Sequence, residues 1–244
     1  VWQLARQAAP ELPLNASTQM SLHTLGGARR AAELGLTRVV LARELSRRDI
    51  AAICRDCPAE VEVFAHGALC MCYSGQCALS AVIGGRSGNR GTCAQPCRLP
   101  YGVNAPAAGG HPLSLKDANL SPYLQELEDM GVACLKLEGR MKRPEYVAVI
   151  TGIYRRLIDE KRRPTAEESR QLELAFSRSG HGGKVIKPRR RQRVPRRVGK
   201  PRGQGDKSCP LIRFCMHPAY ALGSRDSSMK DISHWWPSGS AKRS

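Results

Sequence analysis

Thr37-Arg38-Val39-Val40-Leu41-Ala42 is the stretch that decides the fold class of this chain. It is β-branched and apolar, which suits a strand buried on both faces. Ser46 follows it and is a favoured helix N-cap residue, so we expect a helix from there through Ile53. A second strand, Val61-Glu62-Val63-Phe64, comes next. Strand, helix and strand in this order predict an α/β fold with a parallel sheet.

The same alternation continues outward in both directions. The pattern predicts a strand over 12–18, a helix over 21–34, a helix over 121–130, a strand over 132–137 and a helix over 144–160. Thr165, with Glu168 three residues later, has the pattern of a capping box and predicts one more helix.

Residues 67–112 break this alternation. They are rich in Gly, Cys, Asn, Arg and Pro and have no regular apolar period. A structureless stretch of this length inside a compact domain usually has a functional reason. We therefore expect a Cys-rich loop inserted into the domain.

Four cysteines of this loop have the spacing of metal ligands, Cys70-x6-Cys77-x15-Cys93-x3-Cys97. Glycine permits the tight turns that bring such thiolates together around one soft metal site. An iron–sulfur cluster and a structural zinc ion both use four cysteines, and the spacing leaves both open. The alternative is that the four cysteines are separate buried core residues. This alternative is poorly supported, because the four lie within 28 residues that hold little other apolar material. Three arginines lie between or beside the ligands and would offset thiolate charge: Arg86, Arg90 and Arg98.

The other cysteines of residues 1–180 have weaker patterns. Cys72 lies two residues from Cys70 and competes with it as a ligand. Cys54-x2-Cys57 has redox or zinc spacing, but no second pair is near it, so we interpret the spacing as coincidence. Cys134 lies inside a predicted strand and is expected to be a core residue.

The composition bounds the class of protein. The chain has 244 residues, 41% of them hydrophobic, which is enough for one large domain or two small ones. Ten cysteines without a secretory leader favour thiolate chemistry in a reducing cytoplasm. No apolar run approaches the roughly 18 residues that span a bilayer. The chain starts at Val1 without Met, and we expect it to be a fragment of a longer protein.

The net charge of +18 is concentrated at one end. Residues 181–244 carry 16 basic and 3 acidic side chains, hence +13, which leaves +5 for residues 1–180. The segment 184–207 holds eleven Lys or Arg, several Pro and Gly, and almost no periodic apolar pattern, so we predict a disordered tail. An RNA-binding tail is one interpretation. A shifted reading frame in a G·C-rich gene would give the same composition, and we prefer that interpretation.

Three long motifs resemble those of the collagenase-like peptidase family U32. They are Glu62–Cys77 (EVFAHGALCMCYSGQC), Gly85–Arg98 (GRSGNRGTCAQPCR) and Leu135–Lys142 (LKLEGRMK). The shorter runs at 16–19 and 41–46 fit the family as well. The resemblance covers about residues 1–180 and is specific, because several long motifs occur in the right order.

The resemblance implies a fold and a metal centre. Residues 1–180 would be the C-terminal part of a (β/α)8-type barrel, with the Cys-rich loop 67–112 inserted and the basic tail 181–244 following. Family members carry an iron–sulfur cluster on the cysteines that match Cys70, Cys77, Cys93 and Cys97, which favours a 4Fe-4S cluster over zinc and Cys70 over Cys72.

The resemblance also implies an activity. Several similar proteins hydroxylate a tRNA or rRNA base, others act in oxygen-independent ubiquinone synthesis, and the family name reflects collagenase-like proteolysis. The expected function is hydroxylation of an RNA base, with RNA and a small organic acid donor as partners. The alternatives are an endopeptidase with a peptide substrate and an inactive fragment of either protein.

The chain departs from the family in two respects. The family barrel begins roughly a hundred residues earlier, and a full barrel needs about 250 residues, so the strands predicted here would supply only its second half and leave sheet edges exposed. After Gly180 the family continues with an aromatic, glycine-containing stretch, whereas this chain enters its arginine–proline tract.

Polar residues lie at the C-terminal ends of three predicted strands, where parallel barrels carry their active sites. They are Arg43, Glu44, His66, Lys136, Glu138 and Arg140. An arginine at this position could hold a carboxylate or a phosphate with two hydrogen bonds, and His66 or Glu138 could move protons. The alternative for each residue is an ordinary ion pair at the rim, such as Arg43 with Glu138.

The residues themselves give little support for a peptidase activity. A cysteine nucleophile needs a nearby histidine, and His66 precedes Cys70 by four residues. A cysteine that ligates a cluster cannot also attack a peptide, and the chain has no HExxH zinc-protease motif. Only the family name favours a peptidase.

Overall fold

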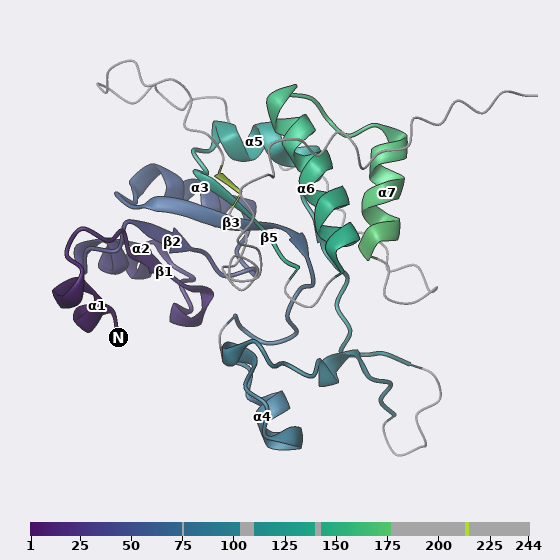
Figure 1. Ribbon diagram of the computed structural model, residues 1–244, viewed down its shortest axis with the longest axis horizontal. Coiled ribbons are helices and arrows are strands. Elements are labelled where there is room, and N and C mark those ends of the chain that lie inside the picture. Colours follow the sequence, from purple (N-terminus) through teal and green to yellow (C-terminus); the bar gives the residue numbers. More distant parts are fainter. Residues whose placement is uncertain (75, 103–109, 140–142, 177–212, 215–244) are drawn as a thin grey trace, which may run out of the picture.

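A computed structural model describes residues 1–74, 76–102, 110–139, 143–176 and 213–214 of the chain (Figure 1). A sheet lies at its centre, with the strand order β1, β2, β3, β5 and β6, and with β4 paired to β3. The strands are β1 (Asn15–Ala16), β2 (Arg38–Val40), β3 (Glu60–Gly67), β4 (Ala118–Asn119), β5 (Cys134–Leu137) and β6 (Arg213–Phe214). All pairs are parallel except β3 with β4. The predicted α/β class with a parallel sheet is therefore confirmed.

One face of the sheet forms the hydrophobic core. Val39, Val61, Val63 and Leu135 are each at most 3% exposed, and their partners in register are Val39 with Val61 and Val63 with Leu135. Alternate residues of a strand point to the same face, so these side chains share one layer with helix residues such as Ile53. Full burial of one such side chain stabilises the fold by about 1.5–3 kcal/mol.

The helices begin where the sequence supplies caps. Within the described residues they are α1 (Trp2–Ala8), α2 (Leu25–Glu33), α3 (Arg47–Asp56), α4 (Leu79–Gly84), α5 (Leu124–Asp129), α6 (Pro144–Asp159) and α7 (Ala166–Phe176). Ser46 caps α3 by accepting a hydrogen bond from the Asp49 amide at 3.3 Å, as predicted. The first predicted helix starts later than expected, because Thr24 is its cap and accepts a hydrogen bond from Gly27 at 3.1 Å.

The opposite face of the sheet carries charged side chains in a row across three strands. Arg38 of β2 lies 2.7 Å from Glu60 and 3.6 Å from Glu62, both on β3. Lys136 of β5 places Nζ 3.0 Å from the same Glu62. Glu62 is only 2% exposed, and two cations compensate its buried charge, as a buried carboxylate requires.

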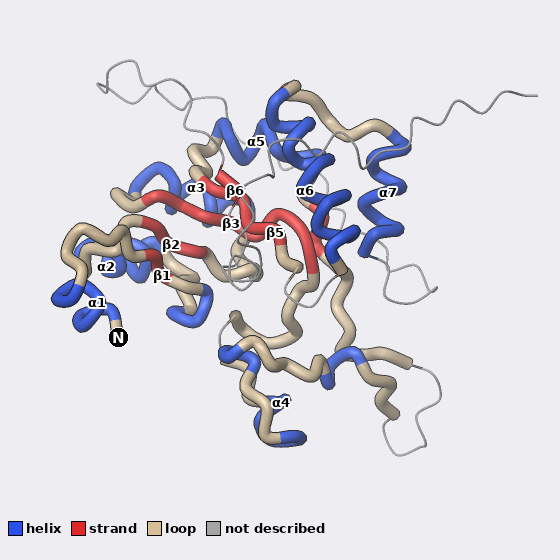
Figure 2. The backbone as a smooth tube through the Cα atoms, viewed as in Figure 1, coloured by secondary structure: helices blue, strands red, loops and turns tan. Residues whose placement is uncertain are grey.

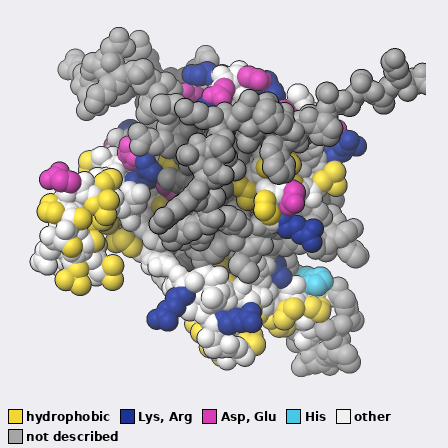
Figure 3. Space-filling view, in the orientation of Figure 1, with side chains coloured by type: hydrophobic (Ala, Val, Ile, Leu, Met, Phe, Trp, Pro, Cys, Tyr) yellow, Lys and Arg dark blue, Asp and Glu magenta, His cyan; other side chains and the backbone are white. Residues whose placement is uncertain are grey.

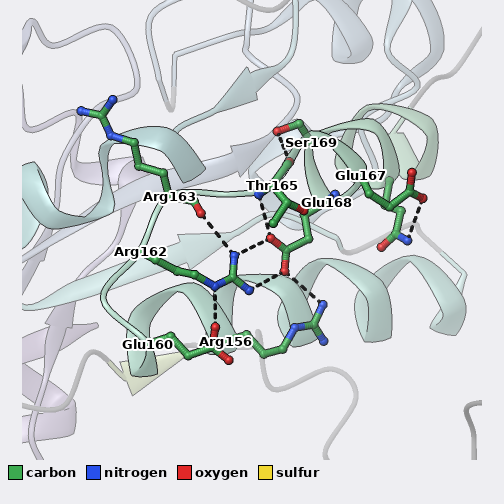
Figure 4. Close-up of polar contacts among 9 residues, drawn as sticks. Arg156, Glu160, Arg162, Arg163, Thr165, Glu167, Glu168 and Ser169 are labelled. Carbon is green, nitrogen blue, oxygen red and sulfur yellow. Dashed lines mark hydrogen bonds and ion pairs between the residues drawn. The ribbon is translucent and has the colours of Figure 1, made fainter.

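Glu168 holds the corner between α6 and α7 (Figure 4). Its carboxylate accepts a hydrogen bond from the Thr165 amide at 2.9 Å, and its own amide donates to the Thr165 hydroxyl at 3.1 Å, which confirms the predicted capping box. Arg162 donates to both carboxylate oxygens, at 2.6 and 2.9 Å. Hydrogen bonds from Arg162, together with the Thr165 amide, outweigh the effect of burial and lower the pKa of Glu168 to about 2.

The Cys-rich loop leaves the sheet and forms a lobe of its own at the bottom of the view (Figure 2). Besides α4 it contains short 3-10 turns at Gly88–Arg90 and Pro96–Arg98. Most of its described residues are otherwise in turns and irregular structure, as its composition predicts. The lobe is joined to the ends of β3 and β4, so its position is set by the sheet.

Two short strands depart from the prediction. β4 is antiparallel to the end of β3, with Asn119 opposite His66, although its sequence has no strand-like pattern. β6 pairs with β5 and lies within the tail that the composition predicts to be disordered. Strand pairing uses backbone groups that every residue except proline carries, which composition does not report. The rest of 181–244 lies outside the described residues, and so does the proposed boundary at Gly180.

Candidate functional site

Arg43 and Glu138 meet at the carboxyl ends of the strands. Arg43 follows β2 and Glu138 follows β5, while β3 lies between them. A single nitrogen of Arg43, Nη2, donates to both carboxylate oxygens, at 3.0 and 2.9 Å. The Arg43 guanidinium also lies over the Phe64 ring, 3.9 Å from its centroid, as in a cation–π contact. The ion pair that the sequence offers as an alternative to catalysis is therefore present.

Arg43 retains an unused donor. Its Nε is buried and has no hydrogen-bond partner among the described residues. A buried donor without an acceptor costs about 1–3 kcal/mol, so this nitrogen is suited to an acceptor that is not part of the described chain. Lys136 lies on the same side, with Nζ 5.6 Å from the centroid of the Phe64 ring. Two cations thus approach one aromatic ring at the strand ends.

Glu44 has a different role from its neighbour Arg43. Its carboxylate accepts hydrogen bonds from the Ser74 amide at 2.7 Å, the Ser74 hydroxyl at 2.8 Å and His23 Nε2 at 2.8 Å. Burial opposes ionisation of Glu44, but the hydrogen bonds of Ser74 and His23 outweigh it and lower the pKa of the carboxyl group. Ser74 is fully buried and also accepts from the Arg43 amide at 3.2 Å. Glu44 therefore fixes the start of the Cys-rich loop to the end of β2.

His66, near the end of β3, is buried against helix α6. It is 3% exposed, its Nδ1 is 3.3 Å from the Tyr154 hydroxyl, and its ring packs edge-on against the Tyr154 ring at 5.6 Å. The Tyr154 hydroxyl donates to the Ala65 carbonyl at 2.9 Å, and burial raises the pKa of Tyr154 strongly. His66 therefore packs between the end of β3 and helix α6 and is shielded from solvent.

Gly67 allows β3 and β5 to end close together. Its φ is +125°, and a Cβ atom there would lie 2.7 Å from the Glu138 Cβ. The Glu138 amide donates to the His66 carbonyl at 2.9 Å, and the Tyr146 hydroxyl donates to the Glu138 carbonyl at 2.9 Å. The backbone of Glu138 is held from both sides, which aims its carboxylate at Arg43.

The four predicted ligands are electrostatic neighbours. Burial raises the pKa of Cys70, the thiolates of Cys77 and Cys72 raise it further, and the positive charge of Arg43 lowers it. Burial also raises the pKa of Cys97, where Arg98 acts to lower it and the thiolates of Cys93 and Cys77 act to raise it. Charge on one cysteine thus acts on the next, from Cys70 through Cys77 and Cys97 to Cys93.

Hydrogen-bond donors point at two of these sulfur atoms. Cys93 Sγ accepts from the Ser80 hydroxyl at 3.5 Å and from the Gln95 amide at 3.3 Å. The Cys72 amide donates to the sulfur of Cys70 and lowers its pKa. Amide and hydroxyl hydrogen bonds to sulfur are among the features that tune iron–sulfur clusters, so the surroundings of Cys93 and Cys70 suit that type of ligand.

Arg98 closes the base of the lobe. It donates to the Ser114 hydroxyl at 2.7 Å, to the Leu69 carbonyl at 3.1 Å and to the Leu115 carbonyl, and it lies 3.4 Å from Asp117. These contacts join the segment before Cys70 to the segment after Cys97 and place a cation beside Cys97.

The sulfur atoms are nevertheless not gathered as tightly as a metal requires. Among the described residues, no three His, Cys, Asp or Glu side chains form a group that could hold a metal ion as it stands. The chemistry of the donor set fits a soft metal centre: four neighbouring thiols, two of them with hydrogen bonds to sulfur and two beside arginines. The metal centre and its occupant stay predictions.

The remaining residues singled out in the sequence have different outcomes. Cys54 is half-buried, and burial followed by the nearby Cys57 raises its pKa to about 11, which is opposite to the lowered pKa of a redox-active pair. Cys134 is completely buried in β5, as predicted. Arg140 lies outside the described residues. Sequence reasoning missed Ser74 and His23, because short-range patterns do not report contacts across 30 and 21 residues.

Comparison with known proteins identifies the family of this chain. The family model described as peptidase family U32 matches residues 1–190. A 23S rRNA 5-hydroxycytidine synthase of Escherichia coli is 44% identical over 155 residues, which cover 62% of this chain and 24% of that protein. A tRNA hydroxylation protein P of Helicobacter pylori is 38% identical over 176 residues, which cover 66% of this chain and 42% of that protein.

A protein named collagenase is also similar. The collagenase of Porphyromonas gingivalis is 37% identical over 164 residues, which cover 57% of this chain and 40% of that protein. These three matches cover from 24% to 42% of the relatives' own lengths, so the chain spans less than half of each. No solved structure matches the chain significantly. Because the family model covers more than half of its residues, this chain belongs to peptidase family U32.

Proposed function

We propose that this chain is the part of an iron–sulfur-dependent RNA-hydroxylation enzyme that carries the cluster ligands and the strand-end site. The observation that carries the proposal is the position of Arg43. Its guanidinium lies between Glu138 and Phe64 at the strand ends, and its charge also acts on Cys70 of the Cys-rich loop. A substrate held at Arg43 would therefore lie near Cys70, one of the proposed ligands.

The proposed ligands are Cys70, Cys77, Cys93 and Cys97. A 4Fe-4S cluster bound to them would supply one-electron redox chemistry. The chain's own residues prepare the place: Glu44 and Arg98 fix the two ends of the loop, and the Cys93 sulfur accepts hydrogen bonds from the Ser80 hydroxyl and the Gln95 amide. Zinc is the less favoured occupant, because zinc sites more often use two closely spaced pairs.

The strand ends would bind the small organic acid donor. The buried Nε of Arg43 would donate to a carboxylate oxygen, and Lys136 would add a second positive charge. Glu138 would orient Arg43 and could accept a proton from a bound group. His66 is buried among tyrosines, which favours a positioning role for it over direct contact with substrate.

The proposal includes the fold and the cellular setting. The parallel sheet with helices after its strands supports the second half of a (β/α)8 barrel, in which the charged face of β2, β3 and β5 would point inward. The described cysteines are all free thiols, which supports a reducing cytoplasm. No described helix has both the length and the apolar character that a bilayer crossing requires.

The RNA substrate rests on the relatives' names. The two RNA-hydroxylation relatives named above are 44% and 38% identical to this chain. The collagenase of P. gingivalis, at 37%, favours an endopeptidase as the second candidate. The site argues against the second candidate: His66 is 3% exposed, and burial raises the pKa of Cys70 instead of activating its thiol.

An anaerobic experiment separates the two. The chain is purified and reconstituted with iron and sulfide, and its absorption spectrum and iron content are measured. RNA from a strain that lacks the modification, and gelatin, are then offered as substrates, with nucleosides analysed by mass spectrometry. We expect bound iron and a hydroxylated nucleoside in the wild type, loss of both in Cys93→Ser, and retention in Cys57→Ser, which changes a thiol outside the loop. Gelatin cleavage that survives removal of iron would overturn the proposal.

A further inference from the structure

One long segment of this chain contains no acidic residue. Residues 63–116 include neither Asp nor Glu, although the whole chain has 21 of them in 244 residues. The same segment contains four cations, Arg86, Arg90, Arg98 and Lys116. It includes the entire Cys-rich lobe, so the lobe has arginine side chains but no Asp or Glu in its sequence. A positively charged surface of this type attracts polyanions.

Two cations of the lobe itself are available to a partner, and Lys116, which follows the lobe, is exposed as well. Arg98 is used inside the lobe, with Leu69, Ser114 and Asp117. Arg86 and Arg90 are exposed and form no ion pair with any described residue. Most exposed arginines on the helices differ in this respect; Arg30, for example, lies 2.9 Å from Glu33.

The lobe also presents an aromatic ring. Tyr73 is 65% exposed, the only aromatic side chain among the large exposed hydrophobic residues of the described chain. Its ring is not loose, because it packs edge-on against His23, with centroids 5.6 Å apart and planes at 87°. His23 is itself fixed, by Glu44 at 2.8 Å and by the Ser21 carbonyl at 2.6 Å. An exposed ring with a fixed support is suited to stacking on a planar group.

Tyr73 lies beside the proposed site. Its neighbour Ser74 is anchored to Glu44 at the end of β2, and its other neighbour is Cys72. The face of the lobe in Figure 3 shows Lys or Arg side chains next to hydrophobic ones, and Val82 and Ile83 of α4 are 81% and 63% exposed. Cations, a supported ring and exposed apolar side chains therefore occur on one lobe, and a polyanion with planar bases matches all three.

We propose that the Cys-rich lobe is the RNA-contacting surface of this protein, with Arg86 and Arg90 on phosphates and Tyr73 stacked on a base. The proposal rests on the proposed function, since it names the surface that would receive the RNA substrate. Single-stranded RNA is the favoured form, because its bases are free to stack on an aromatic side chain. The described lobe would thus guide a loop or strand of RNA toward Arg43 and the ligand cysteines.

Binding is measured on the full chain, reconstituted anaerobically, with a fluorescein-labelled 20-nucleotide single-stranded RNA of mixed sequence. Anisotropy is recorded over a range of salt concentrations for the wild type, Arg86→Gln/Arg90→Gln, Tyr73→Ala and Tyr73→Phe. The control is Arg48→Gln/Arg163→Gln, which removes two exposed arginines outside the lobe and changes the net charge equally. The basic tail contributes the same background to every variant, so differences between variants report the lobe.

The expected results are distinct for phosphate and base contacts. Arg86→Gln/Arg90→Gln reduces the slope of log K against log salt by about 1.4, since each phosphate contact on a single strand contributes about 0.7. Tyr73→Ala weakens binding roughly 10-fold at constant slope, and Tyr73→Phe binds like the wild type. Equal slopes for the lobe variant and the control, or equal affinity of Tyr73→Ala and wild type, would overturn the proposal.

The nucleoside assay keeps the two proposals apart. Lobe-dependent binding without hydroxylation by the wild type would overturn the proposed function and support the surface. Hydroxylation by the wild type with unchanged binding in all lobe variants would support the function and overturn the surface. Folding of each variant is checked by its iron content and by circular dichroism, so that a loss of binding reports contact and not unfolding.

Discussion

Gly67→Ala is expected to destabilise this protein and to disturb its strand-end site together. Gly67 is the last residue of β3, and a Cβ atom there would lie 2.7 Å from the Cβ of Glu138 and 3.3 Å from the carbonyl oxygen of Glu138. Both contacts are with atoms close to the backbone, so no flexible side-chain end can move aside. The segment of Glu138 would have to shift, although Tyr146 and His66 hold it by hydrogen bonds at 2.9 Å.

Two costs add in this substitution. A φ of +125° is strained for alanine, and a residue forced into positive φ costs about 1–2 kcal/mol. An extra methyl group in a close-packed place costs about 1–3 kcal/mol. The sum is about 3 kcal/mol of the free energy of unfolding, which is a large part of the about 5–15 kcal/mol that holds a typical domain.

Urea unfolding, followed by circular dichroism, measures this loss. Gly85→Ala is the matched control: it has φ +63° and nothing within 4 Å of its Cβ, so it carries the strain of positive φ without the collision and should lose only about 1 kcal/mol. Adding Glu138→Gly to Gly67→Ala removes the colliding Cβ and should restore the difference, beyond the additive effect of the two changes.

A Gly67→Ala variant as stable as Gly85→Ala would refute the reasoning, because the collision would then cost nothing. A double variant that is no better than the sum of the single variants would refute the assignment of the collision to Glu138. Either result would also remove the argument that the glycine is what lets Glu138 approach Arg43.

Three further predictions concern other parts of the chain. Glu168→Gln should cost about 1.5–3 kcal/mol, the value of hydrogen bonds to a charged group. Because the pKa of Glu168 is lowered to about 2 from an ordinary 4.5, its contribution is present above pH 4.5 and is lost as the pH falls toward 2, which acid titration of the unfolding midpoint would show. Ser74→Ala should loosen the start of the Cys-rich loop and raise the pKa of Glu44, measured by NMR, with Ser169→Ala as a control outside the loop. Arg43→Lys should keep the iron of the reconstituted protein yet lower its affinity for a small carboxylic acid by about 10-fold, since a lysine cannot reproduce the geometry of the guanidinium; unchanged affinity in a calorimetric titration would contradict the role given to Nε.

The sheet could be predicted from the sequence because its strands carry local signals. The β-branched run before Arg43 and the apolar alternation around Val61 are short-range patterns, and the sheet follows them. Caps at Ser46 and Thr165 gave the starts of their helices for the same reason. β4 had no such signal: its pairing depends on where the end of the lobe returns to the sheet, which is a property of the whole fold.

The candidate site was predictable in part. Strand ends collect polar residues in a parallel sheet, so the meeting of Arg43 and Glu138 follows from topology once the strands are known. The anchoring of the lobe does not, because the contact of Glu44 with Ser74 depends on how a long irregular segment folds back. The burial of His66 also escapes a local pattern, since Tyr154 comes from a helix 88 residues later.

The lobe illustrates why ligand spacing and ligand geometry are separate problems. Its two ends are set by the protein alone: Ser74 is tied to the end of β2, and Arg98 joins Leu69 to Ser114. Between these anchors burial raises the pKa of Cys70 and of Cys97, and thiolates formed there would repel one another unless a positive charge compensated them. Within the part of the chain that the structure describes, Arg43 acts to lower the pKa of Cys70 and Arg98 acts to lower the pKa of Cys97. The proposed metal centre would supply further positive charge, so we expect the final approach of the sulfur atoms to depend on the metal, whereas the two anchors are formed by the chain alone.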